Sequence, residues 1–389
     1  MTVAVYYFPN YHQDTRNHQI HGAGWNEWEL VKNASPRFPG HRQPRIPLWG
    51  YEDESDPVVM ARKIDAAADH GVDVFLFDWY WYNDGQFLEK GLEQGFLQAA
   101  NNNRLQFGIM WANHDWIDIH PARLFECRQN DHRLLYAGKV NREAFERATD
   151  YVIEHYFKHP SYWKIGGAPY FSFYDLSLLL QSLGGVESTR QALASFRAKT
   201  IAAGFPDLHL NQVLWNYNVL PGESRSNGAG VMLKSLGYNS FTSYVWIHHV
   251  AMEQFPQTNY LDVFQKYLEY WERITGEMDL PYYPNLTMGW DSTPRTTQSE
   301  VFENAGYPFT PILKDNTPEN FHRALEEINK RMNSLNIPIL TINAWNEWTE
   351  GSYLEPDTHY GTAYLEAIRD VFGNHNADRP FEKIRMIKD

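Results

Sequence analysis

The chain has 389 residues, of which 43% are hydrophobic and 21% charged, and it carries no apolar run long enough to cross a bilayer. This composition predicts a soluble globular protein with a sizeable core and no membrane insertion. The formal net charge of −14 excludes nucleic acid as an expected partner, because a phosphate backbone would be repelled. The single cysteine, Cys127, excludes an internal disulfide and a thiolate metal cage.

The first residues, from Met1 to Pro9, have the composition of a β-strand. They show neither the basic stretch nor the small-residue cleavage site of a secretory signal, so we expect a cytoplasmic protein. A chain from which a signal peptide had been removed would look the same.

Short β-rich runs alternate with longer segments of helical spacing, a pattern typical of repeated βα units. Most of the runs are apolar enough to be covered on both faces, as strands of a parallel sheet are. Eight such strands close an α/β barrel. We expect them at residues 3–9, 72–82, 106–113, 169–175, 209–215, 240–246, 283–291 and 338–345.

Helices are expected between these strands, the first with Asp56 as its N-cap and Pro57 at the first helical position. No linker, charge block or compositional break interrupts the alternation. Residues 1–389 are therefore predicted to form one domain, a single (β/α)₈ TIM barrel with long βα loops at its C-terminal mouth. The expected helices are 56–70, 86–101, 141–158, 187–203, 228–236, 260–275, 317–332 and 362–372.

Two of the predicted βα loops are long, residues 10–55 and residues 292–316. A structureless connection of the first loop's length is usually a lid or a binding loop. The first loop is also aromatic, acidic and rich in proline, unlike a solvated linker.

Aromatic and polar side chains occupy every predicted strand exit, and exits form the active-site face of such barrels. Tyr and Trp pair an apolar ring with a polar tip, which suits sugar rings, although they could equally fill a large core. Because barrel interiors are normally layers of Val, Ile and Leu, we favour a carbohydrate site. The expected substrate contacts are Tyr7, Tyr11, His12, Trp25, Glu27, Asp78, Trp79, Trp81, Trp111, Asn113, Tyr174, Trp246, Trp290 and Asn346.

Glu347 and Glu350 are the best candidates for catalysis, because cleavage of a glycosidic bond needs two carboxyl groups. They lie three residues apart at the last strand exit, between tryptophans whose apolar rings would raise one pKa. The alternative is an exposed pair of loop residues. Glu27 could be a third acid in the site, or a loop carboxylate bonded to its own backbone.

Metal and cofactor motifs are absent from the sequence. His114, Asp115, Asp118 and His120 lie close together but match no known ligand spacing. There is also no phosphate loop, no nucleophile elbow and no dinucleotide fingerprint. We therefore expect no metal and no cofactor.

Several motifs together resemble a known family. They are Tyr6-Tyr-Phe-Pro9, Gly24-Trp-Asn-Glu-Trp28, Phe77-Asp-Trp-Tyr-Trp81, Leu354-Glu-Pro356 and above all Asn343-Ala-Trp-Asn-Glu-Trp-Thr-Glu-Gly351. Over nearly its whole length the chain resembles the WbsX-type family, described as glycosyltransferases linked to bacterial surface polysaccharide. More weakly, it is similar to glycoside hydrolase family 99, the endo-α-mannosidases and endo-α-mannanases.

The resemblance to family 99 implies roles for the two glutamates. Glu347 would remove a proton from the sugar 2-hydroxyl, which attacks C1 to give a 1,2-anhydro sugar, and Glu350 would be the general acid and then the base. The anomeric configuration would be retained.

The predicted function is therefore that of a retaining, metal-independent glycoside hydrolase. We expect it to be endo-acting on an α-linked bacterial polysaccharide or mannan-like glycan. A glycosyltransferase or transglycosylase of O-antigen or capsule synthesis is the alternative, and a non-catalytic carbohydrate-binding barrel is the second alternative.

Overall fold

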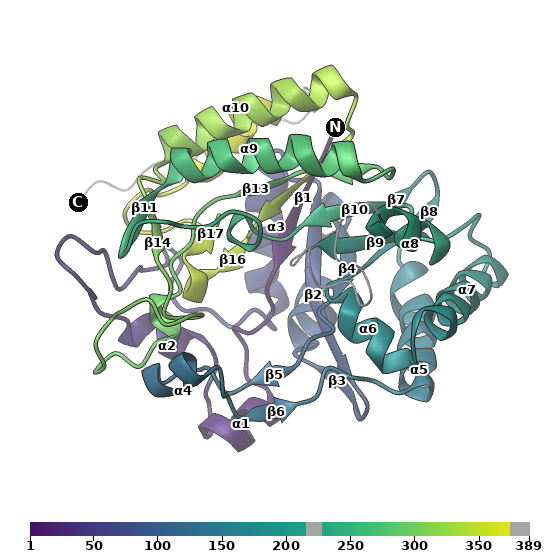
Figure 1. Cartoon of the computed structure of the whole chain (residues 1–389), viewed down its shortest axis with the longest axis horizontal. Coiled ribbons are helices and arrows are strands. Elements are labelled where there is room, and N and C mark those ends of the chain that lie inside the picture. The colour runs from purple at the N-terminus through teal and green to yellow at the C-terminus, as the bar shows by residue number, and fades with distance from the viewer. Residues whose placement is uncertain (215–227, 374–389) are drawn as a thin grey trace.

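The computed structural model describes residues 1–214 and 228–373, and its central element is a barrel of parallel strands (Figure 1). Neighbouring strands around the barrel follow the order β12, β10, β9, β8, β4, β2, β1, β15 and β13. Buried, mostly apolar residues make up these strands, as expected where both faces are covered. The strands are β1 (Thr2–Tyr7), β2 (Val74–Tyr82), β4 (Gln106–Trp111), β8 (Ala168–Phe173), β9 (His209–Leu214), β10 (Ser240–Ser243), β12 (Tyr282–Tyr283), β13 (Asn285–Thr287) and β15 (Ile339–Asn343).

The barrel closes through a strand that Pro284 divides. Before the proline, β12 pairs with β10, and after it β13 pairs with β15. Proline has no N–H to donate, but its carbonyl oxygen accepts from the amide of Thr341 at 2.9 Å. The single strand predicted at 283–291 is therefore two short strands, and together they fill one position in the barrel.

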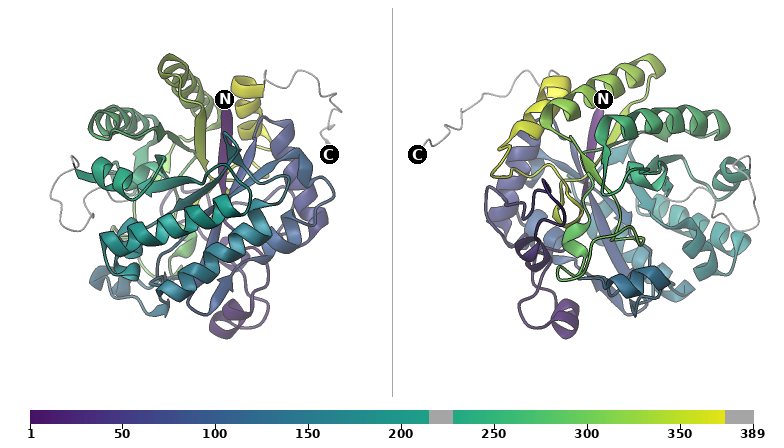
Figure 2. Two further views of the ribbon diagram at one scale, coloured as in Figure 1. Left: turned by 90° about the vertical axis from the view of Figure 1, so that its right-hand side faces the viewer. Right: turned by 60° about the vertical axis from the view of Figure 1, so that its left-hand side comes forward.

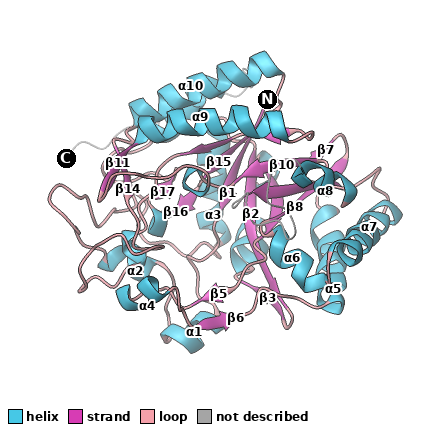
Figure 3. Cartoon of the chain, viewed as in Figure 1, coloured by secondary structure: helices cyan, strands magenta, loops and turns pink. Residues whose placement is uncertain are grey.

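Helices surround the barrel and agree closely with the predicted ones (Figures 2 and 3). Asp56 caps α3 by accepting from the amide of Val58, and Pro57 begins the helix, as predicted. Thr317 caps α10 in the same way through Asn320. The confirmed helices are α3 (Pro57–Asp69), α5 (Arg142–Val152), α7 (Val186–Ala202), α8 (Ala229–Ser235), α9 (Tyr260–Glu277), α10 (Pro318–Leu335) and α11 (Ala363–Phe372).

Some predicted boundaries are wrong. Residues 86–101 are not one helix, because β3 (Gly85–Phe87) turns back to pair antiparallel with β2 before the π-helix η1 (Gly91–Phe96) begins. Residue Asp175 does not end a strand but caps an additional helix, α6 (Leu176–Leu183). Trp215, the last residue of the fifth predicted strand, lies outside the described residues.

The long loops gather at the C-terminal end of the barrel. The first loop, residues 10–55, is not structureless, since it contains α1 (Thr15–His21) and α2 (Trp28–Asn33). Figure 1 shows both helices, together with α4 (Leu124–Gln129) and the β5–β6 hairpin, far from the N-terminus, which begins β1. The hairpin pairs β5 (Trp116–Ile117) with β6 (Leu134–Tyr136).

The interior of the barrel is polar as well as aromatic, which differs from the expected layers of Val, Ile and Leu. Thr242 of β10 and Thr341 of β15 lie 3.2 Å apart between their hydroxyl oxygens, although their strands are not neighbours. Asn285 donates to Thr341 at 3.2 Å. These three side chains bond to one another inside the barrel, so each of them has a hydrogen-bond partner there.

A buried ion pair holds the end of the last strand in place. The Lys63 ammonium of α3 lies 2.6 Å from the Glu355 carboxylate, and both side chains are almost fully buried. The two oxygens of Glu355 also accept from the indoles of Trp345 and Trp348, at 3.0 and 2.7 Å. Lys63 therefore anchors the segment of the chain that carries Glu347.

We predict that Lys63→Met destabilises the protein by roughly 3–5 kcal/mol, because it leaves a buried carboxylate without its cation. The matched control is Lys266→Met, which removes an exposed pair with Glu253 and should cost less than about 1 kcal/mol. Urea unfolding gives both free energies, and similar losses in the two variants would contradict the assigned role of Lys63.

No helix within residues 1–214 and 228–373 combines the length and the apolar character needed to cross a bilayer.

Candidate active site

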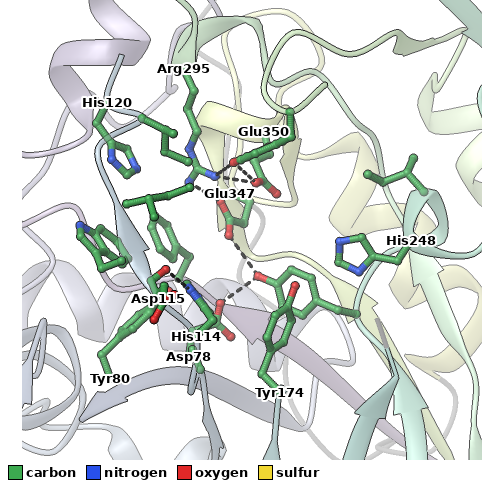
Figure 4. Close-up of a pocket in the computed structure, with 18 of the residues that line it drawn as sticks. Asp78, Tyr80, His114, Asp115, His120, Tyr174, His248, Arg295, Glu347 and Glu350 are labelled. Carbon is green, nitrogen blue, oxygen red and sulfur yellow. Dashed lines mark hydrogen bonds and ion pairs between the residues drawn. The ribbon is translucent and has the colours of Figure 1, made fainter. Parts of the chain in front are cut away.

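A cavity of about 480 Å³ opens among the strand exits and contains both predicted catalytic glutamates (Figure 4). Its volume lies within the usual range for small-molecule sites. The residues that line it belong to β2, β4, β5 and the final hairpin, to the segments that directly follow β1, β4, β5, β8, β10 and β13, and to the second long loop. They are Phe8, Asp78, Tyr80, Met110, Ala112, His114, Asp115, Trp116, Ile117, Ile119, His120, Tyr174, Tyr244, Ile247, His248, Trp290, Arg295, Tyr307, Thr310, Glu347 and Glu350.

Glu347 and Glu350 are held by a short hairpin that follows β15. Glu347 ends β16 (Asn346–Glu347), which pairs antiparallel with β17 (Ser352–Tyr353), and Glu350 ends the intervening turn η7 (Trp348–Glu350). Gly351 makes the turn possible with a φ of 61°, and a side chain there would collide with Asp291. Both carboxyl groups are therefore fixed by the backbone, and Figure 4 shows them side by side.

Arg295, from the second long loop, is the main cation of the site. Its guanidinium nitrogens lie 2.5 Å from Glu350, 3.3 Å from Glu347 and 3.2 Å from Glu27. Its guanidinium also lies 5.4 Å from the ring centroid of Phe8, where a cation–π contact is favourable. One buried guanidinium thus pairs with three carboxyl groups from two parts of the chain, the first long loop and the last hairpin.

Tyr244 connects the carboxyl group of Glu347 with that of Asp78. Its hydroxyl lies 2.8 Å from Asp78 and 3.0 Å from Glu347. A hydroxyl has one proton and can donate to only one of them. A protonated carboxyl group at the other position could donate to the Tyr244 oxygen, so this arrangement favours one proton between Asp78 and Glu347.

The pKa values follow from burial and from these contacts. Burial raises the pKa of Asp78 well above its ordinary value. Burial and the charge of Glu350 raise the pKa of Glu347 well above its ordinary value, against the opposing effect of Arg295. Burial raises the pKa of Glu350 as well, but Arg295 and a hydrogen bond from Tyr307 oppose it. Burial therefore shifts these carboxyl groups toward their protonated forms, most strongly at Asp78 and Glu347.

Glu27 differs from the other carboxyl groups. Burial alone would raise its pKa, but Arg295 and His120 outweigh burial and lower the pKa to about 2. The Glu27 carboxylate also accepts from Thr349 at 2.6 Å. Glu27 is therefore a permanent anion that lies behind the cavity wall and holds Arg295 in place.

A second buried network supports the backbone around Glu350. Asp291 accepts from Arg45, His41 and Gln43 at 2.9–3.0 Å. Burial would raise the pKa of Asp291, but the charges of Arg45 and His41 hold it well below the ordinary value. Because Arg45 also donates to the carbonyl of Gly351 at 3.0 Å, the first long loop is fastened to the hairpin.

Five of the residues predicted from the sequence line the cavity, and the others do not. Those that line it are Asp78, Tyr174, Trp290, Glu347 and Glu350. Those that do not are Tyr7, Tyr11, His12, Trp25, Glu27, Trp79, Trp81, Trp111, Asn113, Trp246 and Asn346.

Most of the aromatic residues in the second group pack in the core. Trp79 contacts Trp81 and Trp111 with ring centroids 5.3 and 5.6 Å apart. Trp246 is fully buried and donates to the carbonyl of Asn285 at 2.9 Å. Trp25 instead stacks on the ring of His21 at 4.0 Å. These side chains therefore support the barrel and the first loop.

The polar residues of the second group hold the backbone behind the cavity. Glu54 accepts from the hydroxyl of Tyr7, the amide of Tyr11 and, in the appropriate tautomer, the ring of His12. Asn346 forms two hydrogen bonds with the backbone of Phe8, at 2.8 and 2.7 Å.

Asn113 has a similar role beside another strand. Its oxygen accepts from the amides of Tyr174 and Asp175, so it positions the exit of β8 rather than facing the cavity.

Sequence reasoning missed Arg295, Tyr244 and Tyr307, which form the hydrogen bonds to the two glutamates. Tyr244 lies in the predicted strand 240–246, for which the larger Trp246 is the expected substrate contact. Arg295 and Tyr307 belong to the second long loop, and no local pattern links an isolated arginine to a site. Within the described part of the chain, His, Cys, Asp and Glu do not gather in threes that could hold a metal ion.

Comparison with protein families gives one match that covers nearly the whole chain. The model of the family described as glycosyltransferase WbsX matches residues 3–368. The chain belongs to the WbsX family. Among curated proteins, WxcX of two strains of Xanthomonas campestris pv. campestris, whose function is uncharacterised, is 26% identical over 95% of this chain. This WbsX-family chain spans about half the length of those relatives, 49%.

Solved structures show the same fold. The endo-α-mannosidase of glycoside hydrolase family 99 from Bacteroides thetaiotaomicron matches with a TM-score of 0.55 at 14% identity, over 96% of each chain. A β-glucosidase from Thermotoga maritima matches with a TM-score of 0.50 at 10% identity, over 95% of this chain and 97% of that one. The WbsX-family chain therefore has the TIM-barrel fold that the sequence predicts.

We predict that Asp78→Asn stabilises the protein increasingly as the pH rises from 5 to 7. A carboxyl group with a raised pKa in the folded state contributes its stability at low pH and loses it as the pH rises, whereas the amide does not titrate. The free energy of unfolding of the variant, relative to that of the parent, should increase by about 1 kcal/mol or more between pH 5 and pH 7. Urea unfolding at each pH measures this difference.

The control, Asp291→Asn, should behave oppositely, because the pKa of Asp291 is lowered. Its stability penalty should be large at neutral pH and shrink below about pH 4. Parallel pH dependences of the two variants would refute the assigned ionisation states.

Proposed function

We propose that this protein is a retaining glycoside hydrolase that acts within an α-linked bacterial polysaccharide or mannan-like glycan. The observation that carries the proposal is the pair Glu347 and Glu350, buried side by side in the cavity and bonded to Arg295. Two buried carboxyl groups, of which at least one can hold a proton, meet the chemical needs of glycoside cleavage.

The surroundings of the two glutamates fit an acid and a base. In our proposal, Glu347 removes the proton of the sugar 2-hydroxyl, and Glu350 protonates the leaving oxygen. Tyr244 bonds both Glu347 and Asp78, so it offers a route by which Glu347 can pass its resting proton to Asp78 before it acts. Tyr307 and Arg295 hold Glu350 through one oxygen, Oε1.

A transferase that uses a nucleotide-sugar donor is the second candidate, because the family is named for glycosyl transfer. Such a donor brings a diphosphate that needs cationic or amide partners. Arg295 is the only Lys or Arg among the cavity-lining residues of the described chain, and carboxylates already occupy its guanidinium. The charge of the cavity therefore favours hydrolysis of a neutral glycan.

We predict that Glu350→Gln lowers reducing-end release from a cleaved glycan by roughly 100- to 10,000-fold, the range expected for loss of a general acid. A substrate with a good leaving group, such as a glycosyl fluoride, should restore most of the activity, because its departure needs no proton. Glu347→Gln should not be rescued in this way. Release is measured on mannans, O-antigens and capsular glycans.

The outcome that would contradict hydrolysis is an absence of release by the parent on all these glycans, together with sugar transfer once nucleotide sugars are added. If the variants bind glycans as the parent does and the parent never cleaves or transfers a sugar, the protein is a non-catalytic carbohydrate-binding barrel. Tyr360→Phe, away from the cavity, is the matched control and should act as the parent does.

Retention and the proposed role of the 2-hydroxyl have their own test. NMR of the first-formed product should show the anomer of the substrate. An otherwise identical substrate with fluorine in place of the 2-hydroxyl should not be cleaved, since it has no nucleophile. Cleavage of the 2-fluoro substrate at a comparable rate would instead indicate a covalent enzyme intermediate.

A further inference from the structure

The cavity has two chemically different parts. Glu347, Glu350 and Tyr244 supply hydrogen-bonding groups at one side. The rest of the wall includes aliphatic side chains without any polar atom, namely those of Met110, Ala112, Ile117, Ile119 and Ile247. Aromatic rings stack on the C–H face of any sugar, but branched aliphatic side chains do not offer such a flat platform. Their presence therefore calls for a substrate with an apolar group of its own.

The three isoleucines come from two separate segments. Ile117 and Ile119 belong to the β5 strand and the residues after it, and Ile247 belongs to the turn η5 (Trp246–His248). Figure 4 shows His120, which follows Ile119, and His248, which follows Ile247, on opposite sides of Glu347. Both segments contribute isoleucines to the lining of the cavity that holds the glutamates.

Several polar groups of the cavity wall already have partners. Trp290 donates its indole N–H to Thr310 at 3.1 Å, and Asp115 accepts from the amide of Gly138 at 2.8 Å. Asp78 is bonded to Tyr244. The isoleucine side chains offer no hydrogen-bond partner, so a hydroxymethyl group packed against them would lose hydrogen bonds to water that these side chains cannot replace. A methyl group there loses nothing and buries apolar surface.

The charges of the cavity exclude anionic sugars. Asp78, Asp115, Glu347 and Glu350 line it, and Arg295 is already paired. A uronic acid or a phosphorylated sugar would place a negative charge beside these buried carboxyl groups, and no Lys or Arg except the paired Arg295 lines the cavity in the described chain.

From these observations we propose that the sugar bound in the cavity is a neutral 6-deoxyhexose, whose C5-methyl group contacts Ile117, Ile119 or Ile247. An acetamido group also carries a methyl, but its amide N–H and carbonyl would each need a partner that the aliphatic wall does not provide. This inference rests on the proposed glycosidase function for the choice of a sugar as ligand.

The test is a binding measurement that needs no turnover. Ligand-observed NMR titration of the parent protein compares methyl α-L-rhamnoside with methyl α-L-mannoside and methyl α-L-fucoside with methyl α-L-galactoside. Each pair differs only by a methyl or a hydroxymethyl group at C5. We expect the 6-deoxy member of at least one pair to bind roughly 10- to 100-fold more tightly, the range for a hydroxyl rejected by an apolar pocket.

Variants locate the contact. Ile119→Thr and Ile247→Thr introduce a hydroxyl into the wall, and at least one should reduce the preference several-fold. Ile312→Thr is the matched control, because Ile312 is buried in β14 (Ile312–Lys314) and does not line the cavity. It should leave the preference unchanged even if the protein becomes less stable.

Two results would overturn the proposal. One is equal or tighter binding of the hydroxymethyl sugars in both pairs. The other is a preference found only when methyl glycosides of N-acetylglucosamine and glucose are compared, which would assign the apolar wall to an acetyl group. If 6-deoxy sugars bind preferentially but no glycan that contains them is hydrolysed, the proposed function fails and the inference on the ligand stands.

Discussion

The contact between Arg295 and its carboxylates is the interaction on which the site depends. Glu27, Glu347 and Glu350 are all buried and lie within 3.3 Å of one guanidinium. Without that cation, three buried carboxyl groups would each face a large desolvation cost and would take up protons. With it, Glu27 stays ionised, while burial still raises the pKa values of Glu347 and Glu350.

The same contact brings together two copies of a four-residue sequence. The letters Trp-Asn-Glu-Trp occur at 25–28 and again at 345–348, and the two glutamates meet at Arg295. Their surroundings nevertheless separate their properties. Glu27 is bonded to His120 and Thr349 and stays ionised, whereas Glu347 lies near Glu350 and Asp78 and is pushed toward its protonated form. Identical local sequences therefore supply a fixed charge in one place and a titrating group in the other.

The sequence predicted the barrel because its strands and helices carry local signals. Buried apolar runs marked the strands, and Asp56 with Pro57 marked the start of α3. The glutamate pair forms a local pattern too, two acids between tryptophans at one exit, and both glutamates line the cavity. Arg295 and Tyr307 could not be found in this way, because their partners lie more than forty residues away in the chain. The rim tryptophans misled for a related reason: an exit residue can point into the cavity or into the packing between strands and helices, as Trp79 and Trp246 do.

The loops around the cavity are usually the parts of a barrel that vary most readily, because the strands below do not depend on them. Here the two members of a buried ion pair come from different loops. Glu27 comes from residues 10–55 and Arg295 from residues 292–316, while Arg45 of the first loop also fastens the hairpin that carries Glu350. A loop transplanted alone into a related barrel would bring a buried charge without its partner. Recombination within such barrels, natural or engineered, would therefore have to move both loops and the final hairpin together as one exchangeable unit.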